Sequence, residues 1–163
     1  MPLPFPFDQT ARPLISFEHL AVSAYDLVLC PGGYEAPDRV RQDRKVKAFV
    51  KGMHDAGKTV AGIDHGIWIM ISAGIMGGRM ACAEGVIKDD LLYAGARVTQ
   101  REEVVVDGTL ITCRSSLWVE AWVRTALLMV EHHTTDELAA LAPHPSNGSV
   151  PKLRQRSLED VGA

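Results

Sequence analysis

Residues 60–74 read VAGIDHGIWIMISAG, and this stretch decides the fold because it joins a strand to a helix within a few residues. The apolar run before Asp64 predicts a buried strand, and the run from Gly66 to Ala73, apolar on nearly every side, predicts a buried helix. Gly62 and Gly66 relieve the crowding that such a sharp bend creates. Because a side chain at this kind of bend is pushed out of the turn, Asp64 is a candidate functional residue.

Asp64 also has an ordinary structural explanation. Aspartate is among the best residues for capping a helix N-terminus, so Asp64 could serve only to cap the helix that follows. In open α/β sheets, however, reactive groups gather at the carboxyl ends of the strands, where helix N-termini point. The residues alone leave both roles open.

The rest of the chain alternates between strand and helix patterns. Upstream, the pattern predicts a short strand at 13–17 (PLISF), a strand at 25–30 (YDLVLC) closed by Pro31-Gly32-Gly33, an amphipathic helix at 38–56 that ends at Gly57, and a strand at 58–63 (KTVAGI). Downstream, it predicts a loop and short helix within 83–96, a hairpin with an Asp-Gly turn within 102–114, and a helix at 117–130. This order predicts an α/β layered fold with a mostly parallel sheet.

Three segments follow from these patterns. Residues 1–24 are predicted to form an N-terminal arm with one short strand, and residues 25–131 a single α/β core domain. Residues 132–163 are predicted to form a helical turn and a tail, because a capping-box start at Thr134 gives way to Pro, Ser, Asn and Gly.

Composition excludes several classes of function. The 163 residues are 47% apolar and 23% charged, which is enough for one full core. The net charge of −3 and the pI near 6.0 come from interspersed signs, which argues against nucleic acid as a partner. No apolar run is long enough to span a membrane, and the start MPLPFPFDQT is not typical of a secretory signal. We therefore expect a cytoplasmic protein.

No cofactor or metal is expected. Cys30, Cys82 and Cys113 are widely separated and odd in number, which favours reduced, buried thiols over disulfides or a zinc site. His132 and His133 point about 100° apart on a helix and have no third ligand at a useful spacing. Phosphate-binding runs of the GxGxxG type are absent.

Four motifs occur in the order seen in a known family: YDLVLCPGGYEAPDRVR, GKTVAGIDHGIWIMISAGIMGGR, IKDDLLYAGA and VVVDGTLITCR. Between about residues 12 and 130 the chain resembles the PfpI-type, ThiJ-like proteins of the class I glutamine amidotransferase-like superfamily. The resemblance implies a flavodoxin-like three-layer sandwich. It also implies one of the family's activities, which are described as protease, amidase, deglycase, chaperone or isonitrile hydratase.

Two departures from the family pattern bear on function. Where the family has a Cys-His-Gly elbow, this chain has Asp64-His65-Gly66, so the thiolate nucleophile is absent. The family's usual N-terminal β-α-β, with a glutamate that contacts the elbow cysteine, has no counterpart ahead of residue 13. An open sheet edge is then expected beside the strand at 25–30, which predicts a homo-oligomer, a dimer at least.

The resemblance supplies further candidate residues. Asp38 matches an acidic residue that, in oligomeric members, orients the elbow histidine of the neighbouring subunit, although an acid at a helix start is also simply favourable. Glu84 lies where the family often has a tyrosine over the elbow, and is otherwise a solvated loop residue. The candidate catalytic residues are Asp64, His65, Asp38 and Glu84, and the candidate substrate-binding residues are Gly33, Tyr34, Trp68 and Arg114.

A carboxylate is a poorer nucleophile than a thiolate but a good base when partly desolvated. We therefore expect a cofactor-independent enzyme of lyase, hydratase or isomerase type that acts on a small molecule, with Asp64 as general acid/base. The alternatives are a hydrolase with Asp64 as covalent nucleophile, a non-catalytic binding protein, or an aspartate introduced in place of a natural cysteine.

Overall fold

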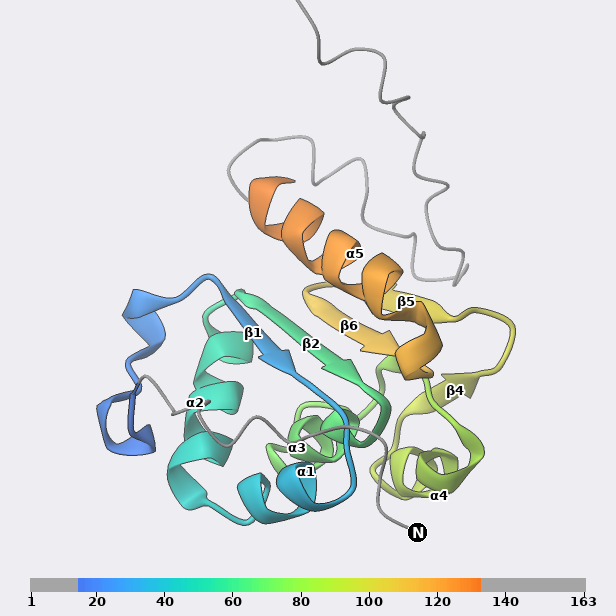
Figure 1. Ribbon diagram of the computed structural model, residues 1–163, viewed down its shortest axis with the longest axis horizontal. Coiled ribbons are helices and arrows are strands. Elements are labelled where there is room, and N and C mark those ends of the chain that lie inside the picture. The colour runs from blue at the N-terminus through green and yellow to red at the C-terminus, as the bar shows by residue number, and fades with distance from the viewer. Residues whose placement is uncertain (1–14, 133–163) are drawn as a thin grey trace, which may run out of the picture.

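The computed structural model describes residues 15–132 (Figure 1). Its elements alternate between strands and helices, as the sequence patterns predict. The strands are β1 (Leu27–Cys30), β2 (Thr59–Ile63), β3 (Met80–Cys82), β4 (Arg97–Thr99), β5 (Val104–Asp107) and β6 (Leu110–Cys113). The helices are α1 (Glu35–Val40), α2 (Arg44–Asp55), α3 (Ile67–Ser72), α4 (Gly85–Tyr93) and α5 (Val119–His132), with short 3-10 turns η1 (Phe17–His19), η2 (Val22–Ala24), η3 (Asp64–Gly66) and η4 (Ser116–Trp118).

The main sheet has four strands in the order β1-β2-β6-β5. The first three are parallel, and β5 runs antiparallel to β6 as its hairpin partner. Helix α5 packs on β2 and β6 from one face, while α2 and α3 cover the other face (Figure 1). The expected α/β class, with its mostly parallel sheet and flavodoxin-like three-layer arrangement, is confirmed.

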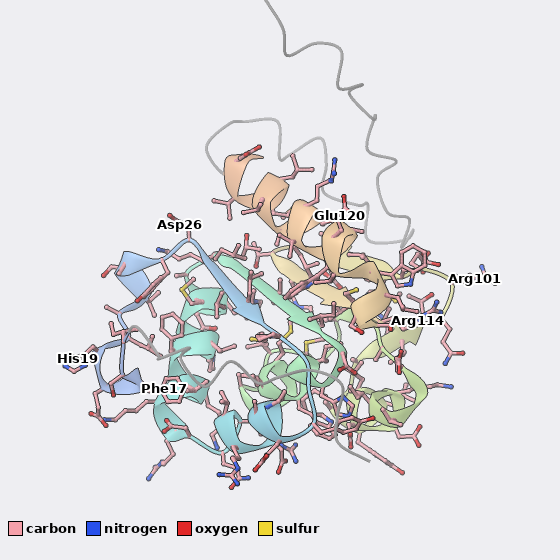
Figure 2. The ribbon with its side chains drawn as sticks, viewed as in Figure 1. Phe17, His19, Asp26, Arg101, Arg114 and Glu120 are labelled. Atoms are coloured by element: carbon pink, nitrogen blue, oxygen red, sulfur yellow. The ribbon has the colours of Figure 1, made fainter. Side chains whose placement is uncertain are left out.

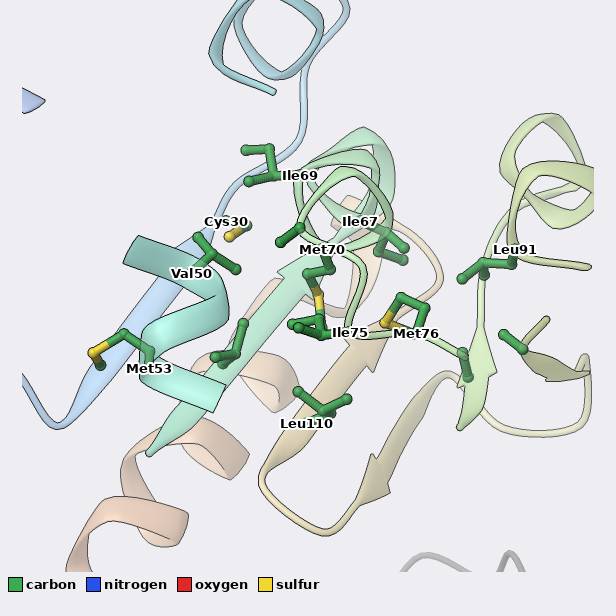
Figure 3. Packing of buried hydrophobic residues seen from close by; sticks show 14 of the residues in the cluster. Cys30, Val50, Met53, Ile67, Ile69, Met70, Ile75, Met76, Leu91 and Leu110 are labelled. Carbon is green, nitrogen blue, oxygen red and sulfur yellow. The ribbon is translucent and has the colours of Figure 1, made fainter. Parts of the chain in front are cut away.

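Both faces of β2 are buried, which explains its continuous apolar sequence. All five residues of β2 are buried, and alternate side chains enter different cores. Val60 lies in the core that α2 and α3 cover, together with Met53, Ile67 and Met70 (Figure 3). Ala61 and Ile63 lie in the second core, under Trp122 and Ala126 of α5.

The predicted helix at 38–56 is broken in the structure. Its apolar spacing continues through the break, but the chain leaves helix after α1 and starts again at Arg44. Asp43 marks the new start, because its side chain accepts hydrogen bonds from the backbone N–H groups of Lys45 and Val46. Gly57 follows α2 with φ +71°, as expected for a residue that ends a helix.

One other expectation about the chain was wrong, and two strands were missed. Residues 15–17 of the predicted PLISF strand form no strand, because Phe17 begins η1 and Ser16 caps that turn; residues 13 and 14 lie outside the described range. Strands β3 and β4, which form a separate parallel pair, were not predicted. Each has three residues, too few for a period-of-two pattern to show.

The predicted boundary at residue 132 falls inside α5, which runs to His132, and the predicted Thr134 capping box lies outside the described residues.

None of the helices between residues 15 and 132 is long and apolar enough to cross a membrane. Within the same range, β1 pairs with β2 on one side and with no strand on the other. Self-association at this edge stays a prediction.

Candidate active site at the strand-to-helix elbow

The bend after β2 has a strained backbone. Asp64 has φ +52° and is the only non-glycine residue among those described with a positive φ. This left-handed conformation costs energy for a residue with a Cβ, although aspartate tolerates it better than most. The N-cap positions of η3 and α3 are Ile63 and Gly66, and neither turn has a side-chain cap. Asp64 therefore does not cap the helix, which removes its ordinary structural explanation.

Two glycines allow the elbow to approach the turn that follows β1. A Cβ on Gly66 would lie 2.0 Å from the carbonyl oxygen of Cys30, and a Cβ on Gly32 would lie 2.5 Å from Oδ2 of Asp64. Gly33, with φ +109°, donates its backbone N–H to that same Oδ2 at 3.4 Å. The Pro-Gly-Gly turn is thus packed against the Asp64 carboxylate.

The neighbouring histidine is tied to the same carboxylate. Nδ1 of His65 lies 2.8 Å from Oδ1 of Asp64. When Asp64 is ionised it can only accept, so Nδ1 carries the hydrogen and Nε2 of the neutral ring is left as an acceptor. Within residues 15–132, Nε2 has no hydrogen-bond partner. The Asp64 side chain is 22% exposed and that of His65 is 9% exposed.

Two aromatic rings contact the imidazole. The Tyr34 ring lies 4.9 Å from the His65 ring, and the Trp68 ring meets it edge-on at 4.7 Å and 83°. Tyr34 is 85% exposed, so it forms the outer wall. The elbow therefore combines a carboxylate, a histidine held at Nδ1 and two aromatic walls.

Three of the predicted binding residues join this arrangement: Gly33, Tyr34 and Trp68. The fourth, Arg114, follows β6 and lies beside the elbow, because Cys113 pairs with Ile63 in the sheet register. Its side chain turns toward the loop before β5, where it donates to the carbonyl of Gln100 at 3.2 Å (Figure 2 labels Arg114). Its part in substrate binding stays a prediction.

The structure does not bring the other two predicted catalytic residues to the elbow carboxylate. Asp38 accepts a hydrogen bond from Nε of Arg41 at 2.9 Å, and no contact within residues 15–132 joins it to His65. Glu84 is exposed at the start of α4, and its described contacts are made by its backbone carbonyl to Ile87 and Lys88. A role across a subunit interface remains a prediction for Asp38.

Two residues near the site escaped the sequence analysis. Asp90 of α4 accepts a hydrogen bond from Nε1 of Trp68 at 2.8 Å, and the guanidinium of Arg41 lies 4.8 Å from the centre of the Trp68 ring. Neither forms a motif with the elbow, from which each is separated by more than twenty residues. Their proximity arises only from the packing of α1 and α4 beside α3.

The three thiols do not replace the missing nucleophile. Cys30, Cys82 and Cys113 are all buried and free, as expected. Burial raises the pKa of Cys30 to about 12 and that of Cys82 to about 11, and it also raises the pKa of Cys113. A protonated, buried thiol is inert toward electrophiles.

Several curated relatives at 30–40% identity carry enzyme names. The deglycase PfpI of Pyrococcus furiosus is 38% identical over 110 residues, which cover 68% of this chain and 65% of that protein. A deglycase of Pyrococcus abyssi is 40% identical with the same coverage. Protein/nucleic acid deglycase 2 of Escherichia coli is 33% identical over 115 residues, covering 71% of this chain and 66% of that protein. The chain thus spans about two thirds of the length of these relatives.

These names overturn the expected reaction class. Deglycase activity is of hydrolase type, so the expectation of a lyase, hydratase or isomerase is wrong. That expectation rested on the chemistry of one residue type, since replacing a thiol by a carboxylate favours proton transfer. A carboxylate beside a histidine serves hydrolysis equally well, and the sequence alone gave no reason to prefer it.

Solved structures and a family model agree with the relatives. A ThiJ/PfpI domain protein from Brachyspira murdochii matches with a TM-score of 0.65 at 21% identity, covering 71% of this chain and 65% of that one. A two-domain protein from Anabaena variabilis with DJ-1/ThiJ/PfpI-like and ferritin-like domains matches with a TM-score of 0.67 at 31% identity, covering 71% of this chain and 32% of that one. The DJ-1/PfpI family model matches residues 8–128. The chain belongs to the DJ-1/PfpI family.

Proposed function

We propose that the protein is a hydrolase of the deglycase type, which uses water to release amines from small carbonyl adducts. The observation that carries the proposal is the 2.8 Å contact between Nδ1 of His65 and Oδ1 of Asp64. In this arrangement the carboxylate fixes the tautomer of the imidazole and holds its Nδ1, and Nε2 is the atom that takes a proton from water. The names of the relatives support the reaction class.

An imine adduct illustrates the reaction. Nε2 of His65 takes a proton from a water molecule whose oxygen attacks the carbon of the C=N bond, the π electron pair moves to nitrogen, and the imidazolium gives its proton to that nitrogen. The resulting carbinolamine collapses when its hydroxyl proton passes to Nε2, the carbonyl re-forms and the C–N bond breaks. The imidazolium then returns a proton to the departing nitrogen. The sum is adduct plus water giving amine plus aldehyde, with the imidazole regenerated.

Asp64 is a positioning residue in this mechanism, and it also stabilises the imidazolium that forms. Its carboxylate is engaged by His65 and by the Gly33 N–H, which favours holding the ring over direct attack on a carbonyl. Tyr34 and Trp68, whose rings both contact the imidazole, offer apolar surface to the substrate.

The experiment follows amine release from the adduct of glyoxal with Nα-acetyl-lysine by proton NMR, against the spontaneous rate. We expect release that depends on the protein, falls at least about 100-fold in His65→Gln, and falls about 10-fold or more in Asp64→Asn. Asp89→Asn removes an exposed carboxylate on α4 and is the matched control, with unchanged rates. Release that is equal in wild type and His65→Gln would contradict the proposal.

The cytoplasmic location expected from the sequence remains a prediction.

A further inference from the structure

We infer that Trp68 is a positioning residue for His65, and that Asp90 and Arg41 hold Trp68 in place. The inference rests on the proposed function, since it assigns these residues to the same imidazole. It goes beyond that function because none of the three belongs to the elbow motif, and two of them lie on other helices. The case depends on a continuous set of contacts from α1 and α4 to the imidazole ring.

The orientation of His65 is only partly fixed by Asp64. One hydrogen bond at Nδ1 sets the position of that nitrogen but leaves the ring free to tilt about the contact. The Trp68 ring supplies the second constraint, because it contacts the imidazole at 4.7 Å with the two ring planes at 83°. Such an edge-to-face pair is a preferred aromatic geometry. Together the two contacts direct Nε2.

Trp68 is in turn held at two points. Its Nε1–H donates to Oδ2 of Asp90 at 2.8 Å, and this charge-assisted bond links α3 to α4. Its ring face lies under the guanidinium of Arg41 at 4.8 Å, within the range of a cation–π contact. A ring pinned at its edge and covered on its face keeps one orientation.

The break between α1 and α2 has a place in this arrangement. Arg41 is the C-cap residue of α1, and Asp38 accepts from its Nε at 2.9 Å. This ion pair orients the guanidinium over Trp68, while Asp43 starts the next helix two residues later. At the helix break, Arg41 thus lies against the indole of Trp68. Its ion pair with Asp38 gives Asp38 a role within its own subunit.

The kinetic test first removes the Asp90 carboxylate, which accepts from the indole N–H of Trp68, and then replaces it with an amide oxygen. Asp90→Ala should lower kcat for amine release about 10-fold with KM changed less than twofold, because a misdirected Nε2 affects proton transfer and not binding. Asp90→Asn should recover most of the rate, since an amide oxygen still accepts from the indole N–H. Trp68→Phe should match Asp90→Ala in kcat, and the kcat of the double variant should fall little further. Asp89→Ala, one residue away and exposed, is the control and should equal wild type.

A spectroscopic test separates this inference from the proposed function. The Cε1–H proton resonance of His65, assigned with His65→Gln, senses the ring current of Trp68. It should shift in Asp90→Ala and in Arg41→Gln, and hold its wild-type position in Asp90→Asn, Asp89→Ala and Arg39→Gln, the last a control arginine on α1 paired with Glu35. If the wild-type protein does not hydrolyse the adduct, the proposed function fails, but the shift of the His65 resonance still tests the inference. A His65 resonance unmoved in Asp90→Ala, or Asp90→Asn as slow as Asp90→Ala, would overturn the inference.

Discussion

Gly66 of the elbow lies so close to Cys30 that a Cβ on the glycine would be 2.0 Å from the cysteine's carbonyl oxygen. This contact joins the end of β1 to the start of α3 and brings the Pro-Gly-Gly turn onto Asp64. The atom that would clash with a larger residue at position 66 belongs to the backbone of Cys30, and a backbone atom cannot rotate away as a side chain can.

Gly66→Ala is therefore expected to lower the free energy of unfolding by about 3 kcal/mol or more, because the clash must displace a strand end. Urea denaturation followed by circular dichroism measures the change. Gly85→Ala is the matched control, since a Cβ there meets nothing within 4 Å. Equal stability of the two variants would show that the elbow and β1 are not in contact.

The positive φ of Asp64 predicts an inverted order of two substitutions. Asp64→Gly and Asp64→Ala lose the same carboxylate, but only alanine, which has a Cβ, is strained at φ +52°. The glycine variant should be more stable than the alanine variant by about 1 kcal/mol. At Lys88, inside α4, the ordinary order should hold, with alanine more stable by about 1 kcal/mol. Alanine as the better residue at both positions would mean that the elbow is not strained.

Asp43 should account for much of the stability of the start of α2. Its side chain accepts from two backbone N–H groups, so Asp43→Ala is expected to cost about 1 kcal/mol in a thermal or urea melt. Asp43→Asn keeps an oxygen acceptor and should cost much less. If the two substitutions proved equally harmless, the helix would not begin where the structure begins it.

Buried thiols predict a loss of stability at alkaline pH. Because burial raises the pKa of Cys30 from 9.0 to about 12, the unfolded chain releases this proton before the folded chain does. The stability that this group contributes is complete below pH 9 and is lost as the pH rises toward 12, at about 1.4 kcal/mol per pH unit. Urea midpoints at pH 8 and pH 10.5 should differ more in wild type than in Cys30→Ala. If the urea midpoint of Cys30→Ala fell as much between these two pH values as that of the wild type, the loss of stability would come from other groups.

Much of the fold was open to prediction from local patterns. Residues 58–73 show an apolar run, a bend with glycines and a second apolar run, and the structure forms β2, η3 and α3 there. The hairpin within 102–114 also appears, although its two turn residues are Gly108 and Thr109, with Asp107 still paired to Leu110. Short-range signals were sufficient because neighbouring residues determine these elements.

Other features depend on contacts between distant residues. The apolar spacing of Val40, Val46 and Phe49 continues through the break after α1, so periodicity alone could not show it, although Asp43 is a residue type that starts helices. Asp64 and His65 could be found because they adjoin the bend. Asp90 and Arg41 could not, because they meet Trp68 only after α1 and α4 pack against α3.

The central claim is that water, activated at His65, attacks the adduct while Asp64 stays unmodified. A single-turnover reaction with the glyoxal adduct of Nα-acetyl-lysine, quenched in acid at intervals and read by intact-mass spectrometry, tests it most directly. We predict that the amine appears while the 17.8 kDa protein keeps its mass at every time point. A transient species heavier by the carbonyl fragment, with the added mass located on Asp64, would contradict the account.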